Sequence, residues 1–239
     1  MSVVAQGADV RDTLIPDMSR LSVRKILFGC GIASALLWIA MDVVASSVYE
    51  GYSYTDQTVS ELSAIDAPTR PFWFFFGTIW SGLVIAFAAG VWQAAGPKRA
   101  LRVVSGLLFT YAVVSLVVGP FSSMHQREVL AAGGATLTDT LHLIVTGLGV
   151  FTFLLEVGFV AAAFGKWFRL YSIATMVAML VFGAITSSYA PEVQANEPTP
   201  WVGVYERINA YGYMLWIAVL ALALWNTSAH DPALLPGQQ

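Results

Sequence analysis

The sequence has few charged residues, and this argues against a soluble protein. Only 11% of its 239 residues are charged and 57% are hydrophobic, whereas soluble globular domains contain about 25% charged residues. A chain of this composition cannot cover a folded core with a water-compatible surface. Length and composition together therefore indicate one polytopic membrane domain rather than a soluble domain with an anchor.

Cysteine, histidine and net charge are also scarce. Cys30 is the only cysteine, which excludes an intrachain disulfide and any zinc site built from cysteines. Three histidines are present, and none of the established metal-binding motifs occurs. The net charge of −3 gives no electrostatic footprint for nucleic acid, so we expect no nucleic-acid partner.

What the sequence does contain is six apolar stretches, each long enough to cross about 30 Å of hydrocarbon as a helix. They do not alternate apolar and polar residues as the strands of a membrane barrel would. The predicted spans are Ile26–Tyr49, Phe72–Ala94, Leu101–Phe121, Asp139–Phe164, Leu170–Tyr189 and Ile208–Trp225. We therefore predict an all-α fold, a six-helix transmembrane bundle over residues 26–225 with short tails at 1–25 and 226–239.

The basic residues predict how this bundle is oriented. Three arginines, Arg70, Arg127 and Arg207, fall on one side of the predicted membrane. The other nine basic residues fall on the opposite side: Arg11, Arg20, Arg24, Lys25, Lys98, Arg99, Arg102, Lys166 and Arg169. Because basic residues accumulate on the cytoplasmic side, we predict a multi-pass protein of the plasma membrane with both tails in the cytoplasm.

The three outer connections, residues 50–71, 122–138 and 190–207, are long, and loops of this length are usually functional or disordered. Two of them contain helix signals. Thr58-Val59-Ser60-Glu61 is typical of a capping box that starts a short helix. Ser123-Met124-His125-Gln126 indicates a second start, and Gly133-Gly134 the corresponding end. We therefore expect folded outer loops.

Polar side chains gather at this predicted outer end. Asp139 and His142 are three residues apart, which places them on one face of a helix. Asp42 lies about 10 Å below the outer end of its span, at 1.5 Å per residue, where a carboxylate needs a partner. The candidate binding residues are Asp42, Ser60, Glu61, Arg70, His125, Arg127, Asp139, His142, Glu206 and Arg207. Ion pairs such as Glu61–Arg70 or Glu206–Arg127 would stabilise such a cluster.

Structural roles are an equally direct interpretation of several of these residues. Glu61 occupies the N3 position of the capping box. Asp139 lies in a first helical turn, where the helix dipole favours a carboxylate. Glu156 is a separate case, since it stands alone among apolar residues in the inner half of its span. At that depth an ionisable group is usually functional or paired, and a protonated acid bonded to a neighbouring helix is the alternative.

Several short motifs resemble those of a known family. They are Ser60-Glu61-Leu62-Ser63-Ala64 and Ala67-Pro68-Thr69-Arg70 after the first span, His125, Asp139 with His142, and Glu206-Arg207-Ile208 entering the last span. In these motifs the chain, from Lys25 to Trp225, resembles the domain-of-unknown-function 998 family of bacterial and archaeal membrane proteins. The resemblance implies a six-helix membrane protein and brings no established activity.

Three functions fit these residues. The first is binding of a lipid head group or a small anionic ligand by the outer arginines and the helix N-termini, with membrane lipids as partners. The second is a zinc-dependent lipid hydrolase, in which His125 and His142, with Asp139 or Glu61, hold zinc and leave a position open for water. The third is an accessory subunit that docks through its outer loops. We favour the first, because the polar residues concentrate on one side of the predicted membrane, and keep the other two as alternatives.

Overall fold

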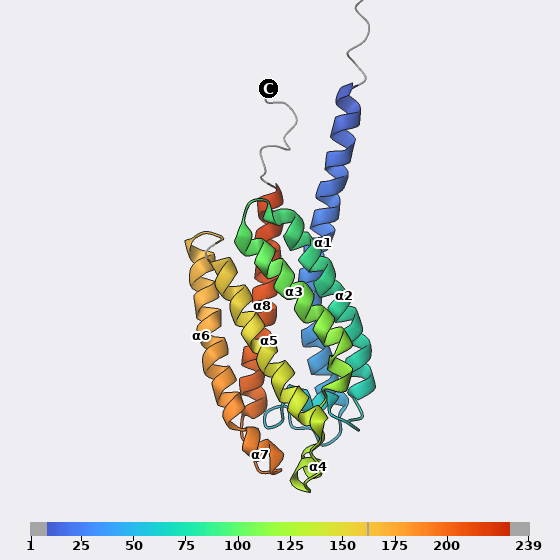
Figure 1. Ribbon diagram of the computed structural model, residues 1–239, viewed down its shortest axis with the longest axis vertical. Helices are drawn as coiled ribbons and strands as arrows, with labels where there is room; N and C mark the ends of the chain where they lie inside the picture. Colours follow the sequence, from blue (N-terminus) through green and yellow to red (C-terminus); the bar gives the residue numbers. More distant parts are fainter. Residues whose placement is uncertain (1–8, 162, 230–239) are drawn as a thin grey trace, which may run out of the picture.

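The computed structural model describes residues 9–161 and 163–229, with side chains from Ser22 to Thr227 apart from residue 162. Within these ranges the chain is helical and contains no strand (Figure 1). Parts of the predicted tails, residues 1–8 and 230–239, lie outside the described residues.

Six long helices form the body of the protein. They are α1 (Asp9–Val48), α2 (Arg70–Ala95), α3 (Arg99–Val117), α5 (Leu137–Ala161), α6 (Lys166–Ser188) and α8 (Val202–Ala229). Each of them contributes a segment that is long and apolar enough to cross a membrane. The predicted all-α six-helix bundle is thereby confirmed, and the chain is a multi-pass integral membrane protein.

Most helix ends differ from the prediction by a few residues; α8, for example, begins at Val202 instead of Ile208, so Glu206 and Arg207 lie inside it. Two other boundaries illustrate the differences. Helix α1 begins at Asp9, inside the segment predicted to be a tail, although its membrane-crossing part is Ser22–Val48. Helix α3 ends at Val117, before the predicted Phe121, because Pro120 cannot continue a helix. The chain turns instead through a short 3-10 helix, η2 (Gly119–Phe121).

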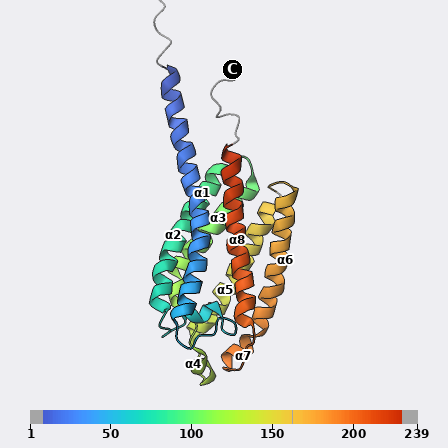
Figure 2. The ribbon, with the colours of Figure 1, turned by 180° about the vertical axis from the view of Figure 1, so that it is seen from behind.

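The long helices form a closed ring in the order α1, α2, α3, α5, α6 and α8, with α8 returning to α1 (Figures 1 and 2). Large buried side chains, among them Trp216, Phe87 and Leu108, fill its interior. Glycine lets α1 and α2 approach closely, because a Cβ atom on Gly31 would lie 2.7 Å from the Phe87 ring. Small residues at such crossings are typical of helices packed in membranes.

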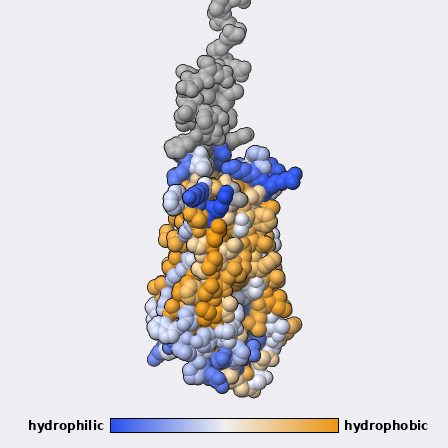
Figure 3. All heavy atoms as spheres, turned by 90° about the vertical axis from the view of Figure 1, so that its left-hand side faces the viewer, coloured by the Kyte–Doolittle hydropathy of each residue, from blue (hydrophilic) through white to orange (hydrophobic). Residues whose placement is uncertain are grey.

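The outer surface of the ring is apolar between two polar ends. Figure 3 shows hydrophobic side chains around the middle of the bundle and hydrophilic ones at each end. Large hydrophobic residues such as Leu36, Phe75 and Leu148 are 60% exposed or more. A surface of this kind is unfavourable in water and suits the hydrocarbon of a bilayer.

At the end opposite the two termini, three connections fold into a cap, which we define as residues 49–69, 118–136 and 189–201 (Figures 1 and 2). It contains η1 (Val59–Ser63), η2, α4 (Arg127–Ala131) and α7 (Ala190–Gln194). The predicted capping box is present, because the Glu61 carboxylate accepts the backbone N–H of Thr58 at 2.6 Å. The predicted second short helix is α4, which is followed by Gly133 at a φ of 80°.

Candidate functional site

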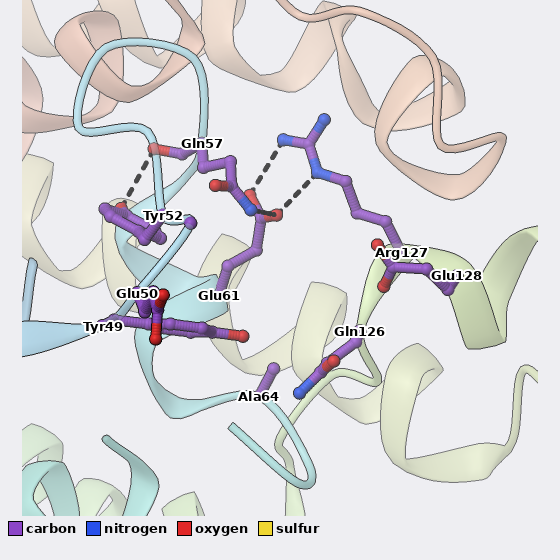
Figure 4. Close-up of a pocket in the computed structure, with 10 residues that line it drawn as sticks. Tyr49, Glu50, Tyr52, Gln57, Glu61, Ala64, Gln126, Arg127 and Glu128 are labelled. Carbon is purple, nitrogen blue, oxygen red and sulfur yellow. Dashed lines mark hydrogen bonds and ion pairs between the residues drawn. The ribbon is translucent and has the colours of Figure 1, made fainter. Parts of the chain in front are cut away.

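The start of α4 is joined to η1 by the buried ion pair of Arg127 and Glu61. The Arg127 Nε and Nη2 atoms donate to the two oxygens of Glu61 at 2.6 and 2.9 Å (Figure 4). Its Nη1 donates to the Thr199 hydroxyl at 2.8 Å, and Nη2 also donates to the Asp56 carbonyl at 3.2 Å. With a further bond to the carbonyl of Glu197, the five N–H groups of this guanidinium have partners within the cap.

A second buried ion pair, Asp42 with Arg207, joins α1 to α8 beneath the cap. The Arg207 Nε and Nη2 atoms donate to the two Asp42 oxygens at 2.8 and 2.9 Å. Tyr211 donates to the same carboxylate at 2.5 Å, and the Tyr54 carbonyl accepts from Arg207 Nη1 at 2.7 Å. Asp42 is 0% and Arg207 3% exposed. The buried carboxylate therefore has the partner that its depth requires, and Arg207 has few donors left for a ligand.

These pairs replace the ones predicted from the sequence, Glu61–Arg70 and Glu206–Arg127, which are wrong. The fold of the cap brings the start of α4 against η1, so Glu61 meets Arg127 instead of Arg70. Glu206 turns toward the N-terminal end of η1, where it accepts the backbone N–H of Val59 at 2.6 Å and contacts the Ser60 hydroxyl at 3.3 Å. The Glu61–Arg127 pair therefore joins two connections of the cap, and Glu206 holds the cap to α8.

Asp139 ties the connection before α4 to the start of α5. One of its oxygens accepts the backbone N–H of His125 at 2.7 Å, and the other lies 2.8 Å from His125 Nδ1 and accepts the Thr136 N–H at 2.8 Å. His142 Nδ1 lies 3.0 Å from the Ser122 carbonyl. Because a carbonyl only accepts, His142 carries its proton on Nδ1, which leaves Nε2 as an acceptor.

The three predicted metal ligands are therefore only partly brought together. His125 and Asp139 are in contact, whereas the Nδ1 atom of His142 is held by the Ser122 carbonyl. Glu61, the alternative carboxylate, is held by Arg127. Over residues 9–161 and 163–229 no group of three or more His, Cys, Asp or Glu side chains is arranged to hold a metal ion. Zinc binding stays a prediction, which metal analysis of the purified protein tests.

A small polar pocket of about 210 Å³ lies within the cap, beside the Arg127–Glu61 pair (Figure 4). The stacked rings of Tyr49 and Tyr52, with centroids 5.7 Å apart, form part of its wall. Burial, and then the nearby carboxylates of Glu128 and Glu61, raise the pKa of Tyr49 above its usual value. Arg127 and Glu61 are thus paired with each other, and the tyrosine stays a neutral hydrogen-bonding group.

A larger cavity of about 300 Å³ lies directly below the cap, between α1, α2, α3, α5 and α8. We call it the bundle cavity. Its wall is mainly aromatic and apolar, with a few polar atoms, and includes Trp38, Trp80, Tyr111, His142, Phe153 and Met214. The indole N–H of Trp80 is buried there and has no hydrogen-bond partner among the described residues.

The bundle cavity adjoins the third arginine of this end, Arg70. Its Nη2 atom lies 3.4 Å from the Pro120 carbonyl, and its guanidinium carbon lies 5.1 Å from the centre of the Phe74 ring. Both Pro120 and Phe74 line the cavity. Within the described ranges Arg70 forms no ion pair, and its Nε atom is buried without a partner. Arg70 therefore differs from Arg127 and Arg207, whose guanidinium groups are held by carboxylates.

Sequence reasoning selected Arg70 and His142 but missed the aromatic wall. Aromatic residues are common in membrane helices, so most of this wall carries no signal in the sequence. Trp38 and Trp80 are the exceptions, because they lie well inside the membrane-crossing segments of α1 and α2, whereas tryptophan in membrane helices is enriched at the two interfaces.

Comparison with known proteins places the chain in a family. The family model described as a protein of unknown function (DUF998) matches residues 32–223. No curated protein and no solved structure matches the chain. The match spans the membrane bundle and the cap together, and the chain therefore belongs to the DUF998 family of proteins of unknown function.

Proposed function

We propose that this integral membrane protein binds an anionic lipid, with an apolar chain in the bundle cavity and the charged head group beside Arg70. One observation carries the proposal. Arg70 lies against the Pro120 and Phe74 wall of the cavity and, in the part of the chain that is described, has no carboxylate partner.

The choice of Arg70 follows from how the three arginines of this end are used. Arg127 donates five hydrogen bonds within the protein, and Arg207 is held by Asp42 and by groups of the cap. Arg70 makes one long bond, at 3.4 Å. A guanidinium with free N–H groups binds a phosphate or carboxylate through two parallel hydrogen bonds, so an anionic head group fits Arg70 and not the other two.

The size and the lining of the cavity suit the apolar chain of a lipid. Its volume of about 300 Å³ is at the lower end of ligand pockets, so it holds part of a chain rather than a whole lipid. Thr78 and Leu116 line it and are also exposed at the surface of the bundle, so it opens between α2 and α3. Trp80 belongs to the wall, and its indole N–H is buried without a hydrogen-bond partner among the described residues.

The head-group contact is tested by the lipid that remains bound to the purified full-length protein, quantified by mass spectrometry. We expect Arg70→Gln to lose the bound anionic lipid. Arg99→Gln is the control, since it removes the same charge from the other end of the bundle, at the first residue of α3. Retention of the wild-type amount of anionic lipid by Arg70→Gln would argue against the proposal.

The cavity is tested by filling it. A Cβ atom on Gly77, which lines the cavity, meets nothing within 4 Å, so Gly77→Leu extends into open space. Gly82 has equally open surroundings but lies exposed on the same helix and does not line the cavity, so Gly82→Leu is the matched control. We expect Gly77→Leu to displace the lipid and Gly82→Leu to keep it. Equal lipid content in the two variants would contradict occupancy of the cavity.

A further inference from the structure

Glu156 is buried in the membrane-crossing segment of α5 and is 0% exposed. The hydroxyl of Tyr213, from α8, donates to its Oε2 atom. The second oxygen, Oε1, is buried and has no hydrogen-bond partner in the described part of the chain. One half of this carboxyl group is therefore satisfied and the other half is not.

The surroundings of Glu156 contain no compensating charge. Among the described residues it forms no ion pair. The titratable groups that act on it are two tyrosines, Tyr213 from α8 and Tyr111 from α3, and both are neutral in their ordinary state. The other neighbours on its own helix, such as Val157 and Val160, are buried and apolar. An ionised carboxylate without a partner is strongly disfavoured in such surroundings, and the neutral acid is the stable form.

Asp42 shows what an ionised carboxylate requires in this protein. It is as fully buried as Glu156, yet Arg207 binds both of its oxygens and Tyr211 adds a third hydrogen bond. Glu156 accepts one hydrogen bond, from Tyr213, in place of these three. Because Tyr213 donates to Oε2, that atom is the carbonyl oxygen of the acid, and Oε1 carries the proton.

We propose that Glu156 is a proton-binding site inside the membrane bundle, and that its proton exchanges with the bundle cavity by way of Tyr111. Tyr111 lines that cavity. The Phe153 ring, which also lines it, lies between Tyr111 and Tyr213, with centroid distances of 4.6 and 3.8 Å. Tyr111 therefore stands two ring contacts from Tyr213, the tyrosine that binds the acid, and lies on the cavity side of Phe153.

This site is independent of the lipid that the cavity is proposed to bind, because its proton is held whether or not a lipid is present. It assigns a role to the one buried acid of the described residues that neither ion pair of the cap end uses. Tyr111 is a relay in this scheme, since its hydroxyl takes up one proton as it gives up another.

The proton is tested by infrared spectroscopy of the full-length protein near neutral pH. A protonated carboxyl group gives a C=O stretching band at a higher frequency than the amide bands, whereas a carboxylate does not. We expect the difference spectrum of wild type and Glu156→Gln to show loss of a protonated-carboxyl band. Loss of a carboxylate band instead would overturn the proposal. Glu156→Gln keeps the size and neutrality of the acid, so it should fold like the wild type.

The route of exchange is tested by transferring the protein into D₂O and following the shift of the same band. We expect Tyr111→Phe to keep the band and slow its shift several-fold. Tyr171→Phe is the control, because it removes a buried tyrosine hydroxyl from a residue of the bundle that does not line the cavity. Exchange in Tyr111→Phe at the wild-type rate would overturn the route through Tyr111.

Discussion

The cap and the bundle cavity hold their polar groups in opposite ways. At the cap, two buried arginines, Arg127 within it and Arg207 directly beneath it, bind carboxylates and backbone carbonyls that surround them. In the cavity, Trp80 Nε1 is buried without a partner, and Arg70 at its edge lacks an ion pair within the described residues. Polar groups that are hydrogen-bonded to one another stabilise a fold, whereas buried donors without acceptors indicate where a ligand binds.

The comparison predicts that damage to the buried ion pair beneath the cap lowers stability most. Arg207→Leu leaves Asp42 buried without its counter-charge, and loss of one partner of a buried ion pair costs about 3–5 kcal/mol. Thermal or denaturant unfolding of the purified protein measures this loss. The double variant Asp42→Leu with Arg207→Leu removes both charges and should recover most of it. A single variant as stable as the wild type would show that this pair does not hold α1 to α8.

A smaller loss is expected where the cap meets α5. Asp139→Asn weakens the bonds to the backbone N–H groups of His125 and Thr136 and the contact with His125 Nδ1. Hydrogen bonds to a charged group contribute about 1.5–3 kcal/mol, so the free energy of unfolding should fall by about 2 kcal/mol. Hydrogen exchange should increase in residues 122–136 and little in α2. An even increase along the chain would contradict this local role.

How much of this the sequence could predict differs between the two regions. The capping box at Thr58 and the need of Asp42 for a partner follow from local spacing and depth in the membrane. The partners do not, because Glu61 meets Arg127 and Asp42 meets Arg207 across long stretches of chain whose approach depends on the fold. The cavity is a property of packing among five helices, so the sequence indicates its aromatic wall only through Trp38 and Trp80, which lie inside their spans.

A weaker effect concerns pH and the rim of the cap. The backbone N–H of Trp201 donates to the Asp56 carboxylate at 3.0 Å, and this bond holds the pKa of Asp56 below its ordinary value of 3.8. Because the folded-state pKa lies below the unfolded one, the contribution to stability is present above that ordinary value. It is lost as the pH falls through the folded-state pKa.

We therefore expect Asp56→Asn to reduce the acid dependence of unfolding below a pH of 3.8. Unfolding curves of variant and wild type across the acid range measure the difference. The effect is small, since Asp56 is exposed to solvent. Parallel curves for the two proteins would exclude this contribution.

The smallest change in stability is expected at the cavity. Arg70→Gln removes a side chain that makes one long hydrogen bond, and surface substitutions of this kind change stability by about 0.5 kcal/mol or less. Its unfolding should be compared after removal of lipid, so that loss of a bound ligand does not lower the apparent stability. A loss as large as that of Arg207→Leu would place Arg70 with the structural arginines and remove the contrast between the two regions.

The most direct test of lipid binding is photo-crosslinking in liposomes with an anionic lipid that carries a photoreactive group on its apolar chain. We predict that the labelled residues concentrate on the cavity wall, in α2 around Gly77 and Trp80 and in α3 around Tyr111 and Ser115. A zwitterionic probe of the same chain should label these residues less, because it gains less from Arg70. Labelling spread evenly over the exposed apolar surface, with no difference between the two probes, would contradict the account.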